Sequence, residues 1–263
     1  MGRTFASSDW HGCLGPAKKV LDFLQPDDKL IFLGDAIDRG DHGFQIMTHL
    51  LDDDRVVYML GNHEQMMLEA IKHMIQYKDE YFIAYSYMDN NWVYGNGGSR
   101  TLEDMHYGEG VDLERLYKRI KEMPDICDYT SKDGKKIILE HAGFTPDKDG
   151  ELKWEDRHHD PVWDRDHFYD LWTGAEDMYL VHGHTPVQYL KFEYGYLGQG
   201  PMSFDELKIK NTWDDPSVHY MPEVIQYCNG HKFDIDMCTI ASGRIALLDL
   251  DTFEIIYFDE EEK

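Results

Sequence analysis

The sequence predicts an α/β fold, because its first third alternates short apolar runs with helical patterns. Three apolar runs, at residues 3–8, 29–33 and 56–60, have the length of buried strands. Helical patterns follow the first two runs, at residues 14–24 and about 42–53. Strands that alternate with helices at this spacing form βαβ units with a parallel sheet. Polar side chains follow each run directly, and ligands of such sheets gather beyond the carboxyl ends of the strands.

The chain continues with a helical stretch and then returns to strands. Residues 64–123 are rich in Met, Tyr, Lys and Glu and predict helices, interrupted by the glycine turn Gly95-Asn96-Gly97-Gly98. A second sheet is expected to begin at 136–140 and 178–181, and a closing hairpin at 243–249 and 253–258. Segment 195–235, with its Gly, Pro and acidic residues, predicts an irregular excursion. No internal repeat or flexible linker divides the chain, so we expect a single domain over residues 1–263.

Length and composition are typical of a globular protein. The chain has 263 residues, of which 42% are hydrophobic and 13% aromatic, which is enough to build a core. No apolar run approaches the ~18 residues of a membrane-spanning helix, and the N-terminus lacks the features of a signal peptide. The four cysteines are scattered without a CxxC pair. We therefore expect free thiols, a cytoplasmic location and no membrane partner.

The charge balance disfavours one class of partner. The net charge is −25, from 51 acidic and 26 basic residues. Such a surface repels the backbone of DNA and RNA, whose binding depends on cationic contacts. We expect no nucleic-acid partner, and interpret most of the acidic residues as a solvated shell.

Five short polar blocks each follow an apolar run. They are Asp9-Trp10-His11-Gly12, Gly34-Asp35-Ala36-Ile37-Asp38-Arg39-Gly40, Gly61-Asn62-His63-Glu64, His141-Ala142-Gly143 and His182-Gly183-His184-Thr185-Pro186. Together they hold acid, imidazole and amide groups that could bind two metal ions. Any one block could arise by chance, whereas all five in this order at strand ends would be an improbable accident.

These blocks resemble those of the calcineurin-like metallophosphoesterases, and within them the phosphoprotein-phosphatase group in its small bacterial and phage form. The resemblance covers residues 3–190 and, weakly, 236–250, where Asp236 and Gly243-Arg244 are similar to the family's closing strand. It implies a two-sheet β-sandwich flanked by helices, with a helical subdomain at about 64–123 beside the active site. It also implies that all metal ligands lie in strand-to-helix loops along one edge.

The candidate ligands suit two divalent ions. Mixed oxygen and imidazole ligation suits Mn, Fe or Zn better than Ca, and we expect Mn. Asp9 and His11 are two residues apart at a strand end, so both side chains can project to one side. Asp35 could bridge two ions with its two oxygens. The resemblance assigns one ion to Asp9, His11 and Asp35, and the other to Asp35, Asn62, His141 and His184. Other histidines, such as His49, His73 and His219, are interpreted as structural.

The resemblance also assigns the catalytic roles. Two ions ~3.5–4 Å apart can activate a shared hydroxide for in-line attack on phosphorus. His63 resembles the general acid that protonates the leaving oxygen, with Asp38 orienting its imidazole. Asn62, Arg39 and a second arginine would bind the phosphate. Val162-Trp163-Asp164-Arg165 resembles the phage-type segment that supplies this arginine, so Arg165 is the candidate, with Arg157 nearby.

One departure separates branches of the family. Nuclease relatives usually end with a Gly-His-x-His block, but Pro186 occupies the place of the second histidine, and His182 is interpreted as a supporting or structural residue. The pattern favours a serine/threonine protein phosphatase acting on a phosphorylated protein or a small phosphate ester. The alternative is a dinucleoside polyphosphate (diadenosine tetraphosphate) hydrolase. A non-catalytic scaffold is disfavoured because His63, Asp38 and Arg39 are all present.

Overall fold

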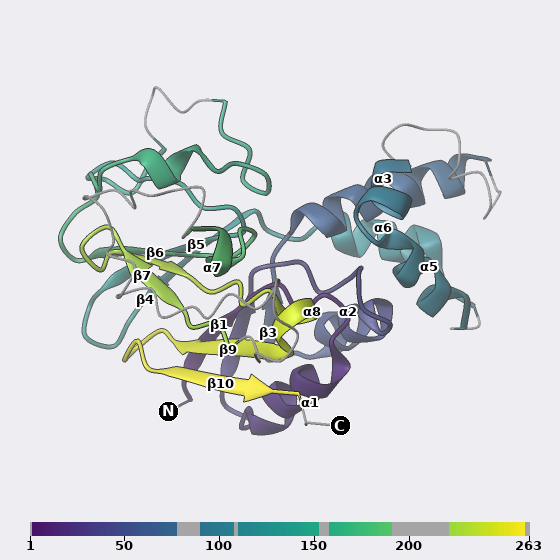
Figure 1. The fold of residues 1–263 in the computed structure, drawn as a ribbon, viewed down its shortest axis with the longest axis horizontal. Coiled ribbons are helices and arrows are strands. Elements are labelled where there is room, and N and C mark those ends of the chain that lie inside the picture. Colours follow the sequence, from purple (N-terminus) through teal and green to yellow (C-terminus); the bar gives the residue numbers. More distant parts are fainter. Residues whose placement is uncertain (1, 78–89, 108–109, 153–157, 191–220, 261–263) are drawn as a thin grey trace.

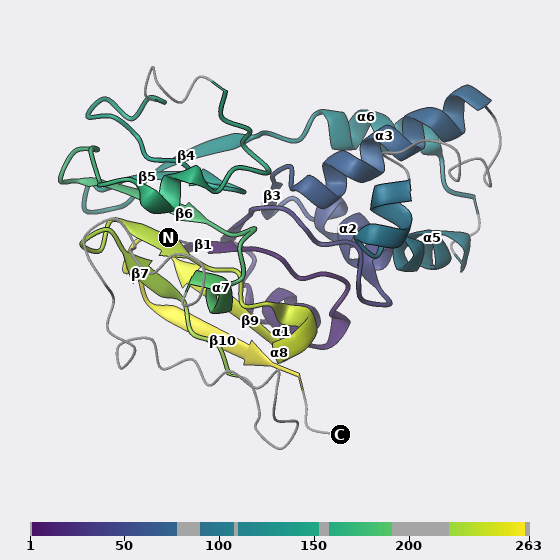
Figure 2. The ribbon, with the colours of Figure 1, turned by 45° about the horizontal axis from the view of Figure 1, so that its top comes forward.

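Two five-stranded sheets lie face to face and form the larger part of the protein (Figures 1 and 2). The computed structural model describes residues 2–77, 90–107, 110–152, 158–190 and 221–260. Helices flank the sheets, which confirms the predicted α/β sandwich.

The first sheet contains the three parallel strands that the amino-terminal apolar runs predict. They are β1 (Thr4–Ser7), β2 (Lys29–Phe32) and β3 (Val56–Tyr58). The closing hairpin, β9 (Arg244–Asp249) and β10 (Ile255–Asp259), joins the same sheet in the order β10-β9-β1-β2-β3. Strand β9 runs antiparallel to β1, with Phe5 opposite Asp249. The first and last parts of the chain therefore share one sheet.

The second sheet repeats this arrangement with strands from the second half. Its order is β4 (Ile126–Thr130), β5 (Lys136–Glu140), β6 (Met178–His182), β8 (Lys232–Asp234) and β7 (Ile225–Tyr227), of which β5, β6 and β8 are parallel. The expectation of an irregular excursion over 195–235 is wrong at β7 and β8, while residues 191–220 lie outside the described part. Each of these strands is only three residues long, so the sequence carries no readable alternation, and pairing with neighbours defines them.

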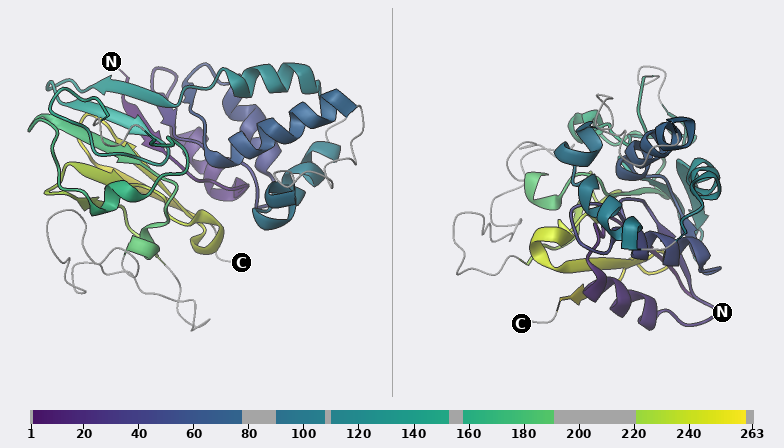
Figure 3. Two further views of the ribbon diagram at one scale, coloured as in Figure 1. Left: turned by 90° about the horizontal axis from the view of Figure 1, so that it is seen from above. Right: turned by 90° about the vertical axis from the view of Figure 1, so that its right-hand side faces the viewer.

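Two groups of helices flank the first sheet. Helix α1 (Leu14–Phe23) packs against β9 and β10, and α2 (Gly43–Asp52) packs against β3. The helical stretch expected over 64–123 is helical in its described parts. It comprises α3 (Asn62–Tyr77), the π-helix η2 (Asn91–Gly95), α5 (Gly98–Tyr107) and α6 (Leu113–Lys121), which gather to one side of the sheets (Figure 3). That these helices form a subdomain of a single domain stays a prediction.

Short helices lie in the connections of the second half. They are the 3₁₀-helix η4 (Asp166–Tyr169), α7 (Val187–Leu190) and α8 (Thr239–Ser242). Among the described residues, none of the helices is long and apolar enough to cross a membrane.

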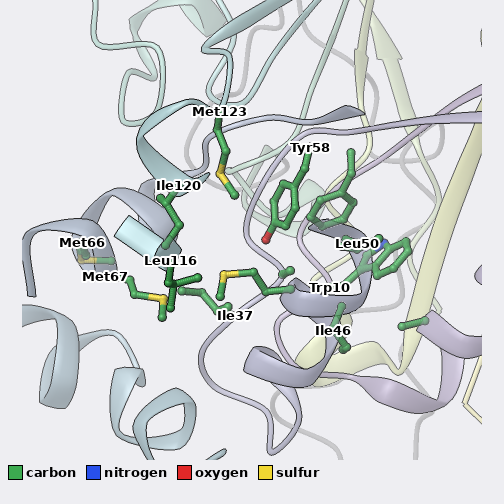
Figure 4. Close-up of a cluster of buried hydrophobic side chains, with 14 of the residues drawn as sticks. Trp10, Ile37, Ile46, Leu50, Tyr58, Met66, Met67, Leu116, Ile120 and Met123 are labelled. Carbon is green, nitrogen blue, oxygen red and sulfur yellow. The ribbon is translucent and has the colours of Figure 1, made fainter. Parts of the chain in front are cut away.

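Separate apolar clusters fill the space between the sheets and the space under the helices. Ala6 and Ile31 of the first sheet, and Leu33 just beyond β2, meet Leu139 and Val181 of the second sheet, which closes the sandwich. Another cluster joins Trp10 and Ile37 from the polar loops to residues of the flanking helices (Figure 4). Those residues include Met66 and Met67 of α3 and Leu116 and Ile120 of α6. Burial of each such side chain stabilises the fold by about 1.5–3 kcal/mol. The packing of Trp10 and Ile37 therefore holds the loops that carry the polar blocks against the helices.

Candidate active site

Each of the six parallel strands ends at a buried polar residue. Beyond the carboxyl ends of β1, β2, β3, β5, β6 and β8 lie, in that order, Asp9, Asp35, Asn62, His141, His184 and Asp236, each at most 7% exposed. The sequence predicts the first five of these as ligands. The two sheets therefore bring blocks far apart in the sequence to one edge of the sandwich, as the parallel topology requires.

Asp9 and His11 face the same region, but not for the reason that the sequence suggests. Strand β1 ends at Ser7, and Asp9 and His11 have left-handed backbones with φ of 57° and 41°. Bonds from Asp9 N to Gly34 O (3.1 Å) and from His11 N to Asp35 O (3.0 Å) hold this turn on the next loop. Left-handed backbone in non-glycine residues costs energy and concentrates at functional sites. Strand alternation is therefore not what directs these side chains.

Asp35 lies between two groups of possible metal ligands. Its Oδ2 is 3.8 Å from His11 Nε2, and its Oδ1 is 3.6 Å from His141 Nε2. The groups that could each hold an ion are His11, Asp35 and His63, and Asp35, His141 and His184. Burial raises the pKa of Asp35 well above its usual range, and the carboxylate of Asp9 adds to this effect. Such a buried, unneutralised carboxylate is suited to cations.

The second group contains a fourth donor, the amide oxygen of Asn62. Asn62 Oδ1 is 3.0 Å from His141 Nε2 and 2.8 Å from His184 Nδ1. His141 Nδ1 is 2.8 Å from the carbonyl of Leu33, to which it donates, so its Nε2 keeps a lone pair. Oxygen and imidazole donors converging in this way fit a transition-metal or zinc ion. The two sets sharing Asp35 are consistent with a dinuclear metal site.

His63 and Asp38 form a buried hydrogen-bonded pair. His63 Nδ1 is 2.6 Å from Asp38 Oδ2, and its Nε2 is 3.0 Å from a terminal guanidinium nitrogen of Arg39. Because arginine only donates, Nε2 accepts, and the proton is on Nδ1 facing Asp38. Burial lowers the pKa of His63 well below its usual range, and Arg39 lowers it further. Burial raises the pKa of Asp38 to about 7.

The helical region holds Asp38 in place, through residues that sequence reasoning missed. Thr101 on α5 donates to Asp38 Oδ1 at 2.5 Å, and Trp92 on the π-helix donates to Oδ2 at 2.7 Å. The glycine turn gives the available sequence signal. A Cβ on Gly98 would lie 2.6 Å from the Trp92 ring, and one on Gly97 would lie 2.8 Å from Arg39 N. Only glycine allows this approach, so the turn brings the helices onto the Asp38 loop.

Glu64 supports the Asp35 loop and is a third residue whose role the sequence did not reveal. Its carboxylate accepts hydrogen bonds from the backbone N–H of Asp35 (2.8 Å) and of Ala36 (3.1 Å), and from the Tyr58 hydroxyl (2.8 Å). Glu64 is fully buried. The sequence signal for this role is the position of Glu64 directly after Asn62-His63, within one of the five polar blocks.

Two arginines from different loops lie near the candidate ligands. Arg39 contacts His11 Nε2 at 3.0 Å as well as His63, and Arg165 donates to Thr185 Oγ1 at 2.9 Å. Burial lowers the pKa of His184 well below its usual range, and the charge of Arg165 lowers it further, which places that guanidinium near the ligands. Arg157 lies outside the described residues.

Within the described part of the chain, the remaining histidines lie outside the two groups of possible metal ligands. His182 is fully buried, with Nε2 2.7 Å from the Tyr227 hydroxyl and Nδ1 3.1 Å from Gly183 O, so its contacts fit a supporting residue. His49 and His73 lie on α2 and α3, and His219 lies outside the described part.

Fold and site together define a metal-dependent phosphoesterase. The sequence profile of calcineurin-like phosphoesterases matches residues 2–231, and the chain belongs to this family, whose members are hydrolases. Among curated proteins, none matches the sequence.

Solved structures show the same fold at low identity. A putative diadenosine tetraphosphatase is 14% identical with a TM-score of 0.53, covering 100% of this chain and 95% of that one. A protein serine/threonine phosphatase from Saccharomyces cerevisiae is 13% identical with a TM-score of 0.52, covering 100% and 81%. A cold-active protein-tyrosine phosphatase from Shewanella is 14% identical with a TM-score of 0.51, covering 98% and 81%.

Proposed function

We propose that the protein is a phosphomonoesterase that uses two divalent ions. Asp9, His11 and Asp35 hold one ion, and Asp35, Asn62, His141 and His184 hold the other. The observation that carries this proposal is that the two oxygens of Asp35 face two separate donor groups. Mn is the favoured metal, and Fe or Zn would also suit these donors. When bound, the ions would supply a hydroxide nucleophile and neutralise charge on the phosphate oxygens.

The side chains around the ions divide the remaining tasks. Arg39 and Arg165 bind phosphate oxygens, for which the guanidinium fork is well shaped. Asn62 directs Oδ1 to the histidines, which leaves its NH₂ group for the phosphate. His63 acts as the general acid toward the leaving oxygen in its imidazolium form, in which Nε2, the acceptor of the Arg39 hydrogen bond in this structure, carries a second proton. Asp38 holds the opposite nitrogen at 2.6 Å and keeps the ring oriented for this transfer.

Phosphoserine or phosphothreonine in a protein is the proposed substrate, with small phosphate esters also accepted. A pocket of about 170 Å³ opens beside the Arg165 segment, and its lining includes His159, Asp164, Asp166 and Asp170. Burial opposes protonation of His159, but Glu140 and Asp164 outweigh it and raise its pKa to about 9, so His159 is paired internally. The other acids repel additional phosphates. This acidic lining disfavours a chain of phosphates, such as that of diadenosine tetraphosphate, extending over this pocket.

The test compares substrates with one enzyme preparation. Protein stripped with a chelator and reloaded with Mn²⁺ is assayed on phosphoserine, phosphothreonine and phosphotyrosine peptides, p-nitrophenyl phosphate, bis-p-nitrophenyl phosphate and diadenosine tetraphosphate. We expect kcat/KM to be highest for the phosphoserine or phosphothreonine peptides and turnover to require metal. Faster cleavage of the tetraphosphate would favour dinucleotide hydrolysis, and faster cleavage of the diester would favour a phosphodiesterase. Full activity in stripped protein would refute the metal mechanism.

A further inference from the structure

The carboxyl end of β8 carries a buried acid that the proposed mechanism does not use. Strand β8 pairs in parallel with β6 so that His182 lies opposite Asp234. His184 and Asp236 therefore occupy equivalent positions, two residues beyond that pair. A hydrogen bond from Val187 N to Asp236 O (3.1 Å) keeps the two segments together. Since the other five parallel strands each end at a proposed metal ligand, Asp236 stands where a sixth would be expected.

The charged side chains that interact with Asp236 belong to the candidate active site. Burial raises the pKa of Asp236 well above its usual range, and the carboxylate of Asp9 raises it further. The guanidinium groups of Arg39 and Arg165 act in the opposite direction. The carboxyl group of Asp236 is therefore within electrostatic reach of one proposed metal ligand and of both proposed phosphate-binding arginines.

The local structure does not require a charge at this position. One oxygen of Asp236 accepts the N–H of Cys238 at 2.8 Å, and an asparagine could provide the same acceptor. No ion pair joins Asp236 to any lysine or arginine in the described ranges, although Asp236 is only 2% exposed. Its neighbour Asp234 is also fully buried, with Oδ2 lacking a partner. Burying carboxyl groups without a counter-charge is costly, so a role in fold stability alone does not explain this acid.

We propose that Asp236 is a positioning residue of the metal site held by Asp9, His11 and Asp35, to which it adds negative charge without being a direct ligand. This inference rests on the proposed function. The charge raises the affinity of the site for a divalent cation, and the bound cation in turn offsets the cost of burying Asp236. Groups just outside the ligands typically change metal affinity by about 10–100-fold.

The test is Asp236→Asn, which keeps the acceptor for Cys238 N–H. Mn²⁺ binding to stripped protein is measured by calorimetry, and the melting temperature is measured with and without Mn²⁺. We expect the affinity of one of the two sites to fall about tenfold or more. The melting temperature of the stripped protein should rise, because an unpaired buried acid is removed.

Asp28→Asn is the matched control, because Asp28 is buried to the same degree but lies before β2, at the opposite end of the strand that leads to Asp35. It should lower the melting temperature and leave Mn²⁺ affinity unchanged. If Asp236→Asn behaves like this control, or leaves both Mn²⁺ affinities unchanged, the inference is wrong while the proposed function stands. If the wild-type protein binds no Mn²⁺, the proposed function and the inference fail together.

Discussion

Two aspartates at opposite ends of β2 are almost equally inaccessible to solvent but have opposite electrostatic surroundings. Asp28 precedes the strand and Asp35 follows it, with 3% and 2% of each exposed. Asp28 accepts hydrogen bonds from the backbone and guanidinium of Arg3 (2.9 and 2.7 Å) and from Gln25 N (3.1 Å). Burial opposes its ionisation, but these bonds outweigh it and lower the pKa of Asp28 to about 2. Around Asp35, burial and Asp9 raise the pKa instead.

The difference shows at which end of the sheet the protein neutralises its buried carboxylates with its own cationic side chains. At the amino end, the chain supplies the cation, and the ion pair stabilises the fold. At the carboxyl end, the nearby Arg39 is hydrogen-bonded to His11 and His63, and the acids are left for cations from solution. Stability and binding are thus assigned to opposite edges. Substitutions at the two ends should separate these contributions.

The largest expected effect is that of Asp35→Asn. Because Asp35 faces both donor groups, the substitution should remove bound metal from both positions. The loss of activity should be at least as large as that caused by removing a general acid, which is about 10²–10⁴-fold. Metal content by inductively coupled plasma mass spectrometry and turnover of phosphoserine peptide measure this. Asp28→Asn serves as the control and should retain metal and activity. Two ions bound to Asp35→Asn with wild-type affinity would contradict the shared-ligand assignment.

His63→Asn should separate chemistry from metal binding within the carboxyl edge. Turnover of phosphoserine should fall by about 10²–10⁴-fold, because the proton donor is lost. The loss should be smaller for p-nitrophenyl phosphate, whose leaving group needs little protonation. Both ions should stay bound.

The result decides between two readings of the site, since His63 also lies within reach of His11 and Asp35. Loss of one ion from His63→Asn would make His63 a ligand and refute the general-acid assignment. His73→Asn, a histidine on the same helix, should leave both activity and metal content unchanged.

The smallest effect is that of Asp28→Asn on stability. We expect a loss of about 1–2 kcal/mol in the free energy of unfolding at neutral pH, a modest value because the Arg3 side chain is 38% exposed and solvent screens the pair. The pKa of Asp28 is lower in the folded protein (about 2) than in the unfolded chain (about 3.9).

The contribution of Asp28 is therefore complete above about pH 4 and is lost as the pH falls toward 2. Denaturant unfolding of both proteins between pH 2 and 7 measures this. The two stability curves should converge near pH 2. A difference that stays constant down to pH 2 would show that Asp28 acts through packing and not through its charge.

The sequence by itself determined the main strands and the positions of the candidate ligands. Strands β1, β2, β3, β5 and β6 are apolar runs, and each leads into a polar block. A parallel sheet brings such ends together however far apart they are along the chain. Proximity of Asp35 to Asn62, and of His141 to His184, therefore followed from local pattern and sheet geometry, whereas the meeting of the two pairs at one edge was predicted from the family resemblance.

Only the tertiary structure decided which groups support those ligands. Trp92 and Thr101 reach Asp38 from 54 and 63 residues away, and no local pattern encodes such partners. Strand β8 forms because its three residues pair with β6. This pairing also determines the position of Asp236. Local sequence records whether a side chain is buried, whereas the hydrogen-bond partner of a buried polar group depends on how distant segments pack.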